Sequence, residues 1–413
     1  MHTFIRRFVT LCLAGLVVSQ AAAAAERDPA LERANRLLSK TILIDGHNDL
    51  PWAIRNDKTA PGDVDAYDLR GKVPGQTDLA RLRAGHLGGQ FWSVYIPGET
   101  DGHYARTQLE QIDIALRMIR RYPEALQFAS SAADIRAAHR NGKIASLLGM
   151  EGGHAIGNSL GALRAYYDLG VRYMTLTHNV HLDWADSAAF PPVHGGLTPF
   201  GEQVVLEMNR LGMLVDLSHV AAETMDDALR VSKAPVIFSH SSARAICDVP
   251  RNVPDDILAR LKDNDGIIMI TFVAPFIDPA FAAVQKPAME EFKQRSQGKS
   301  IEEQKAIQKE IFSKVTLPAV SIAKVADHFD HVRKVAGVEH IGIGGDYDGN
   351  SDWPVGLSDV SMYPNLFAEL IRRGWTDREL ERVAGGNLLR VLEKAESVAR
   401  SMKDLPVPPG LAR

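Results

Sequence analysis

The chain has 413 residues, of which 45% are hydrophobic and 24% are charged, and its formal net charge is −4 at pH 7. This size allows a large globular core, and the near balance of 47 basic and 51 acidic side chains argues against a nucleic-acid-binding protein. Only two cysteines are present, which excludes a scaffold held together by several disulfides.

The first 25 residues have the pattern of a secretory signal peptide. Arg6 and Arg7 precede an apolar run of 11 residues, Phe8 to Val18, and five consecutive alanines end at residue 25. An apolar run of this length is shorter than the roughly 20 residues that span a membrane, so we expect no membrane anchor. We therefore predict a protein exported to the periplasm or secreted, by the twin-arginine or the Sec route, with Cys247 as the one cysteine of the mature chain.

Short apolar runs alternate with helical patterns along the rest of the chain. Apolar residues recur three and four positions apart in 104–121, 160–169, 199–211 and 222–231, which predicts helices there. The eight predicted strands are Thr41–Asp45, Gln90–Ile96, Ile144–Met150, Tyr173–Thr177, Met213–Leu217, Val236–Ser239, Ile267–Thr271 and His340–Gly344. Eight alternating units favour an α/β fold of the (β/α)8 TIM-barrel type, with a doubly wound open sheet as the alternative.

Residues 26–413 are predicted to form a single barrel domain with two additions. The segment 274–316, after the seventh strand, contains two helical patterns and is interpreted as a helical insertion. Barrel active sites lie at the C-terminal ends of the strands, so this insertion is either a wall or lid of the site or a surface hairpin. Residues 404–413 form a Pro-rich tail.

Residue types that bind metals recur just past the ends of the predicted strands. His47 and Asp49 follow the first strand, and alternate side chains of an extended chain point the same way. Glu151 follows the third strand, His219 the fifth and His240 the sixth. Because the C-terminal ends of barrel strands meet at one mouth, we expect these five side chains to lie close together.

Five protein ligands are more than one catalytic zinc ion usually takes. Two Zn²⁺ ions per chain would use all five, with Glu151 as the bridge between an ion on His47 and Asp49 and an ion on His219 and His240. Two ions roughly 3.5–4 Å apart can hold a water whose pKa falls toward about 7. The sequence thus predicts a metal-bridging hydroxide that attacks a carbonyl or phosphoryl centre.

Three further polar residues have candidate roles near this nucleophile. Asp346 follows the eighth strand and is suited to contact the substrate and carry a proton to the leaving group, with Asp348 as the alternative if the chain stays extended. His178 follows the fourth strand and is assigned to the substrate carbonyl or oxyanion, with metal ligation as the alternative. Arg251 follows the sixth strand and can hold a substrate carboxylate through paired hydrogen bonds.

Eight motifs occur in order between about Leu43 and Leu392. They are Asp45-Gly-His-Asn-Asp-Leu-Pro, Gly149-Met-Glu-Gly-Gly-His, Leu176-Thr-His-Asn, Asp216-Leu-Ser-His-Val, Phe238-Ser-His-Ser-Ser-Ala, Arg251-Asn-Val-Pro-Asp, Gly344-Gly-Asp-Tyr-Asp-Gly and Gly386-Asn-Leu-Leu-Arg-Val. With these motifs the chain resembles the membrane (renal) dipeptidase family, peptidase family M19 of the amidohydrolase superfamily. The resemblance implies a barrel of the metallo-dependent hydrolase type.

The resemblance also implies a binuclear zinc site with the same five ligands, and it maps the substrate histidine, the carboxylate-binding arginine and the catalytic aspartate onto His178, Arg251 and Asp346. The implied activity is that of a zinc-dependent dipeptidase, which also accepts dipeptides with a C-terminal D-residue. Two alternatives stay open: a binuclear amidohydrolase acting on an N-acyl D-amino acid or a β-lactam, and a metal- or substrate-binding protein without turnover. We expect small dipeptide substrates and no nucleic acid as partners, and the sequence leaves a homodimer open.

Overall fold

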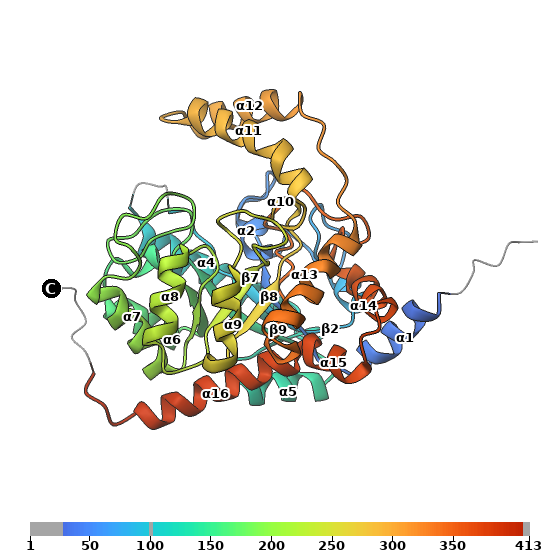
Figure 1. Ribbon diagram of the computed structural model, residues 1–413, viewed down its shortest axis with the longest axis horizontal. Helices are drawn as coiled ribbons and strands as arrows, with labels where there is room; N and C mark the ends of the chain where they lie inside the picture. Colours follow the sequence, from blue (N-terminus) through green and yellow to red (C-terminus); the bar gives the residue numbers. More distant parts are fainter. Residues whose placement is uncertain (1–27, 99–101, 408–413) are drawn as a thin grey trace, which may run out of the picture.

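The structure of the protein is a computed structural model that describes residues 28–98 and 102–407 (Figure 1). The predicted signal peptide, residues 1–25, and the last residues of the Pro-rich tail lie outside the described residues. Within the described ranges, no helix is both long and apolar enough to cross a membrane.

Eight parallel strands form the closed barrel that the sequence predicted. They are β1 (Leu43–Asn48), β2 (Leu87–Ser93), β4 (Ile144–Glu151), β5 (Val171–Thr175), β6 (Leu214–Asp216), β7 (Ile237–Ser241), β8 (Ile267–Ile270) and β9 (Ile341–Ile343). Each strand pairs with the next along the chain, and the pairing of Asp45 in β1 with Ile343 in β9 closes the ring. This closure excludes the open doubly wound sheet. All eight residues of β4 are buried, as expected for a strand covered on both faces.

One strand was not predicted. The short strand β3 (Leu126–Phe128) pairs with residues 144–146 at the start of β4, outside the barrel ring. Leu126 is buried and Phe128 is exposed, so three residues gave too little apolar pattern to distinguish this strand from a loop.

Helices surround the barrel, and the four helical patterns named from the sequence are confirmed. The helices are α1 (Pro29–Leu38), α2 (Leu50–Arg55), α3 (Leu79–Ala84), α4 (Tyr104–Arg121), α5 (Ala132–Arg140), α6 (Leu160–Asp168), α7 (Pro199–Leu211), α8 (Ala222–Val231), α9 (Asp255–Asn264), α10 (Ala274–Ile277), α11 (Pro279–Ser296), α12 (Ile301–Phe312), α13 (Ile322–Val335), α14 (Tyr363–Arg372), α15 (Asp377–Glu381) and α16 (Asn387–Met402). Helix α7 illustrates the local signals. The Thr198 side chain caps its first turn, Pro199 occupies its first position, and Gly212 ends it with φ 83°.

The predicted helical insertion follows β8, the seventh strand of the barrel, and consists of α10, α11 and α12. In Figure 1, α11 and α12 lie side by side and stand away from the barrel. Lys293 of α11 places its ammonium 3.6 Å from the centre of the Phe190 ring in the loop between β5 and α7. The short helix α10 instead places Phe276 at the barrel mouth. The segment is therefore a wall of the mouth at α10 and a surface hairpin beyond it.

Candidate active site

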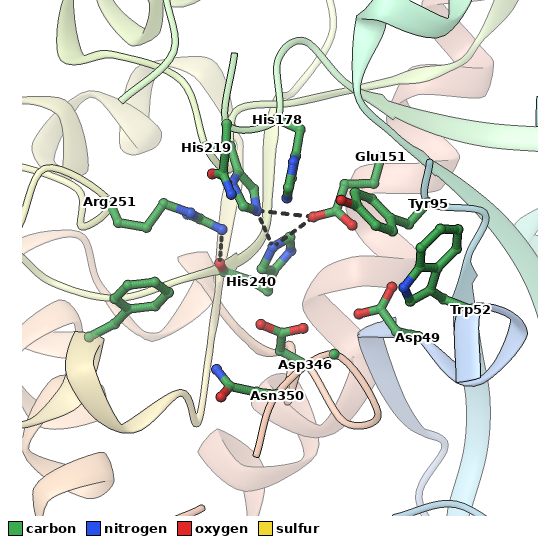
Figure 2. A pocket seen from close by; sticks show the side chains of 13 residues that line it. Asp49, Trp52, Tyr95, Glu151, His178, His219, His240, Arg251, Asp346 and Asn350 are labelled. Atoms are coloured by element: carbon green, nitrogen blue, oxygen red, sulfur yellow. Dashed lines mark hydrogen bonds and ion pairs between the residues drawn. The ribbon is translucent and has the colours of Figure 1, made fainter. Parts of the chain in front are cut away.

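The C-terminal ends of the strands surround a cavity of about 360 Å³ at one mouth of the barrel (Figure 2). It is lined by Asp49, Trp52, Tyr95, Glu151, His178, Asn179, His219, His240, Arg251, Phe276, Asp346, Gly349 and Asn350. Seven of the eight predicted site residues are in this lining. The eighth, His47, is fully buried beside it, with Nε2 3.2 Å from Oδ2 of Asp49. The structure thus brings all eight together.

The backbone that carries the first two predicted ligands differs from the expectation. Strand β1 ends at Asn48, and Asp49 is the residue before α2 with φ −92° and ψ 21°, so the extended geometry predicted for Asp49 is wrong. Its side chain makes no capping hydrogen bond to α2. The carboxylate consequently remains directed toward His47 and the cavity.

The two oxygens of Glu151 face different histidines. Oε2 lies 3.4 Å from Nε2 of His47, whereas Oε1 lies 3.0 Å from Nε2 of His219 and 3.3 Å from Nε2 of His240. The Nε2 atoms of His219 and His240 are themselves only 2.9 Å apart. Figure 2 shows these two rings converging on the carboxylate from one side of the cavity. The glutamate therefore stands between two groups of nitrogen donors.

This set of donors fits divalent metal ions. Three sets of side chains each bring three candidate ligand atoms within 4.8 Å of one another. The sets are His47, Glu151 and His240; Glu151, His178 and His219; and His47, Asp49 and Asp346. Among the described residues, buried His47 Nε2 and Asp49 Oδ1 have no hydrogen-bond partner. Buried polar atoms are seldom left unpaired, and imidazole and carboxylate are the ligands that zinc takes in catalytic sites.

The protonation of these groups follows from their surroundings. Burial lowers the pKa of His219 and of His240 well below the ordinary value, which favours the neutral imidazole that binds metals. Burial also opposes a charge on His47, but nearby Tyr173, Glu151 and Asp49 outweigh it and raise the pKa of His47 well above normal. The surroundings of His47 therefore favour a positive charge, which a bound cation would supply.

Arg251 is fixed at the side of the cavity. It is only 8% exposed, and it donates from Nη1 to Oγ of Ser241 at 2.9 Å and from Nη2 to the carbonyl oxygen of His240 at 3.1 Å. Its guanidinium lies 5.4 Å from the centre of the Phe276 ring. Burial lowers the pKa of Arg251 to about 10, so the side chain remains cationic at neutral pH. The cavity thus has one fixed positive charge that can face an anionic substrate group.

Asp346 enters the site from a left-handed turn after β9. Its φ is 65°, and its Oδ1 lies 4.0 Å from Nε2 of His47. Burial raises the pKa of Asp346 well above normal. The extended chain on which the Asp348 alternative depended is absent, because Asp348 is also left-handed, with φ 64°. Oδ1 of Asp348 instead accepts a hydrogen bond from the backbone N–H of Gln76 at 2.7 Å. Asp348 is not among the residues that line the cavity.

His178 lies in the loop after β5, beside the second histidine group. Its ring centre is 4.4 Å from that of His219 and 4.8 Å from that of Tyr95. The Ser187 hydroxyl donates to the carbonyl oxygen of His178 at 2.6 Å and holds the backbone of this loop. His178 is therefore adjacent to the candidate metal ligands and also open to the cavity.

Sequence reasoning assigned no role to six residues that line the cavity: Trp52, Tyr95, Asn179, Phe276, Gly349 and Asn350. Trp52 and Tyr95 pack edge to face with ring centres 4.9 Å apart. Two signals were available, since Trp52 follows Asp49 by one helical turn and Tyr95 lies near the end of the predicted second strand. Phe276 had no such signal, because α10 is a four-residue helix inside a long insertion.

A closed (β/α)8 barrel with clustered imidazole and carboxylate side chains at its strand ends defines a metal-dependent hydrolase. The model of the membrane dipeptidase family, peptidase family M19, matches residues 31–405 of the chain. The chain belongs to this family and is a dipeptidase of the metallopeptidase type.

The relatives agree with this assignment. The chain is 45% identical to Dipeptidase 3 of Mus musculus over 388 residues, which cover 92% of this chain and 70% of that protein. Among solved structures, it resembles the probable dipeptidase PvdM from Pseudomonas aeruginosa at 25% identity and a TM-score of 0.78, covering 90% of this chain and 99% of the other. It also resembles a metallo peptidase from Rhodobacter sphaeroides, liganded with a phosphinate mimic of the dipeptide L-Ala-D-Ala, at 25% identity and a TM-score of 0.71, covering 86% and 99% of the two chains.

Proposed function

We propose that the chain is a dipeptidase that uses two Zn²⁺ ions, one held by His47 and Asp49 and the other by His219 and His240, with Glu151 shared between them. The observation that carries this proposal is the position of Glu151. Its Oε2 faces His47 at 3.4 Å and its Oε1 faces His219 at 3.0 Å, so one carboxylate can serve two ions. When bound, two divalent ions lower the pKa of a water that they share, which makes it a nucleophile at neutral pH.

The side chains around the metal ligands can bind the dipeptide and move its protons. Arg251 pairs with the C-terminal carboxylate of the substrate, because it is the fixed cation of the cavity lining and carries several donor groups in one plane. His178 contacts the carbonyl oxygen of the scissile bond and stabilises the negative charge that develops there. Asp346 accepts a proton from the attacking water and delivers it to the leaving amine nitrogen.

We propose small dipeptides as substrates, including those with a C-terminal D-residue. A cavity of about 360 Å³ is at the small end of the range for ligand sites, and Trp52, Tyr95 and Phe276 restrict it. The resemblance to the metallo peptidase liganded with a mimic of L-Ala-D-Ala supports tolerance of a D-residue. We further propose that residues 26–413 act as one exported barrel domain, on the evidence of the signal-peptide pattern at residues 1–25.

Metal stoichiometry tests the binuclear centre. Zn²⁺ titration of the purified chain should show two ions bound, and Glu151→Gln should lower the affinity for both of them. Glu207→Gln is the matched control, because Glu207 is also a buried glutamate but pairs with Arg164 and Arg210 away from the cavity. A wild-type stoichiometry of one, or a Glu151→Gln variant that loses a single ion, would contradict the bridging role.

A substrate panel tests the reaction. L,L- and L,D-dipeptides, N-acyl D-amino acids and a β-lactam should be compared by kcat/KM with the zinc-loaded enzyme. We expect dipeptides to be hydrolysed best. Faster turnover of an N-acyl D-amino acid or a β-lactam would instead identify the alternative amidohydrolase.

A further inference from the structure

Each of the three candidate ligand histidines has its Nδ1 atom beside an oxygen of another side chain. The pairs are His47 with Tyr173 Oη at 2.8 Å, His219 with Asn179 Oδ1 at 3.0 Å, and His240 with Ser239 Oγ at 2.8 Å. Such partners hold the proton on Nδ1 and leave the Nε2 lone pair for a metal. The three partners are all uncharged, but they differ in what they are bonded to in turn, because Ser239 Oγ also donates to the carboxylate of Asp216.

The partner of His240 is connected to a buried carboxylate. Asp216, at the end of β6, is fully buried and accepts four hydrogen bonds. Its Oδ1 accepts from the backbone amides of Ser218 at 3.1 Å and Ser239 at 2.8 Å. Its Oδ2 accepts from the hydroxyls of Ser239 at 2.6 Å and Thr175 at 2.5 Å. Asp216 therefore ties β5, β6 and β7 together beneath two of the predicted ligands.

The number of protons fixes the direction of this chain of hydrogen bonds. Ser239 has one hydroxyl proton, and it donates that proton to Asp216. Toward His240, the Ser239 oxygen can then only accept, so Nδ1 of His240 is the donor. The chain runs from imidazole through hydroxyl to carboxylate, and its negative end makes His240 a stronger electron donor at Nε2.

The other two histidines lack such a connection. His47 faces the phenol of Tyr173, which burial keeps neutral by raising its pKa well above normal. His219 faces the uncharged amide of Asn179, which is exposed. Of the three ligand histidines, His240 is thus the one whose Nδ1 partner hydrogen-bonds to a carboxylate.

We propose that Asp216 is a positioning residue that acts through Ser239 on His240, and that it selectively raises the affinity for the metal ion held by His219 and His240. The inference rests on the proposed binuclear centre. It predicts that the two ions depend on different supporting residues, so that one can be weakened without the other.

The test compares two hydroxyl deletions that both remove one donor from Oδ2 of Asp216. Ser239→Ala breaks the link to His240, whereas Thr175→Val removes the other donor with little change of shape and leaves the link in place. Zn²⁺ affinities are measured by competition with a chromophoric chelator, without reference to activity. We expect Ser239→Ala to lower the affinity for one of the two Zn²⁺ ions by roughly 10–100-fold, and Thr175→Val to bind both ions with near wild-type affinity.

A double-mutant comparison identifies which ion is affected. In a His219→Ala background, in which the ion on His219 and His240 is already impaired, Ser239→Ala should cause little further loss. Asp216→Asn, which keeps the size of the side chain, should reproduce the selective effect and serves if Ser239→Ala does not fold.

The outcomes separate this inference from the proposed function. A wild-type chain that binds a single ion overturns both. A wild-type chain with two ions whose affinities are unchanged by Ser239→Ala and Asp216→Asn overturns only the role of Asp216. Equal losses in Ser239→Ala and Thr175→Val would also overturn it, because the effect would then come from the carboxylate's packing rather than from the link to His240.

Discussion

Removing the Arg251 guanidinium tests how the enzyme recognises the end of its substrate. Arg251 spends one donor on Ser241 and one on the His240 carbonyl, which leaves others of its five N–H groups for a ligand. Because the side chain is only 8% exposed, a carboxylate bound there is largely removed from water. Truncating one partner of a buried charge pair costs about 2–5 kcal/mol, so Arg251→Ala should lower kcat/KM for a dipeptide by roughly 30- to 5,000-fold.

The assay pairs a free dipeptide with the same dipeptide carrying a C-terminal amide. The wild-type enzyme should prefer the free acid strongly, and Arg251→Ala should remove most of that preference, mainly through KM. Arg251→Lys should fall between them, because it keeps the charge but loses the paired geometry. Zinc content must be measured in parallel, since Arg251 also contacts the backbone of His240, a proposed metal ligand. Equal losses on the acid and the amide, with zinc retained, would refute the carboxylate role.

Three further substitutions probe the proton carrier, the packing behind the site and the acid sensitivity of the fold. Asp346→Asn should retain both ions but lower kcat by roughly 10²- to 10⁴-fold. Asp348→Asn, the neighbouring control, should leave kcat near the wild-type value. Full activity in Asp346→Asn would contradict proton transfer by this residue. Gly149→Ala would drive a methyl group into the Tyr173 ring, so we expect a loss of about 1–3 kcal/mol in urea unfolding and weaker zinc binding. Burial lowers the pKa of His328 from 6.5 to about 4. At roughly 1.4 kcal/mol per pKa unit, this difference corresponds to about 3 kcal/mol in the free energy of unfolding. Because the folded state binds fewer protons than the unfolded one between these values, this stability is present above pH 6.5 and is lost as the pH falls toward about 4. His328→Gln should flatten the dependence of the free energy of unfolding on pH in this range, and an unchanged slope would refute the role of His328.

The sequence predicted the barrel and the composition of its mouth because both depend on local patterns. Apolar runs of strand length locate the strands, and the residues directly after them must meet at one end of a parallel barrel. Glu151, His219 and His240 could be placed in this way without knowledge of any contact. The supports behind them could not, because they join distant parts of the chain. Tyr173 is 126 residues from His47, and Thr175 is 41 residues from Asp216.

The direction of the site residues was the second feature that the sequence could not supply. The expectation of an extended chain was wrong at Asp49, and the extended chain on which the Asp348 alternative depended is absent. Asp346, Asp348 and His219 are all left-handed, with φ 65°, 64° and 67°. A left-handed conformation is costly for residues other than glycine, and such strain persists only where the surrounding structure enforces it. At His219 and Asp346 this left-handed turn comes three residues after the strand ends, and both side chains line the cavity. Position after a strand therefore predicts which residues reach the site, whereas the local backbone turn, set by tertiary contacts, determines which of their atoms face the cavity.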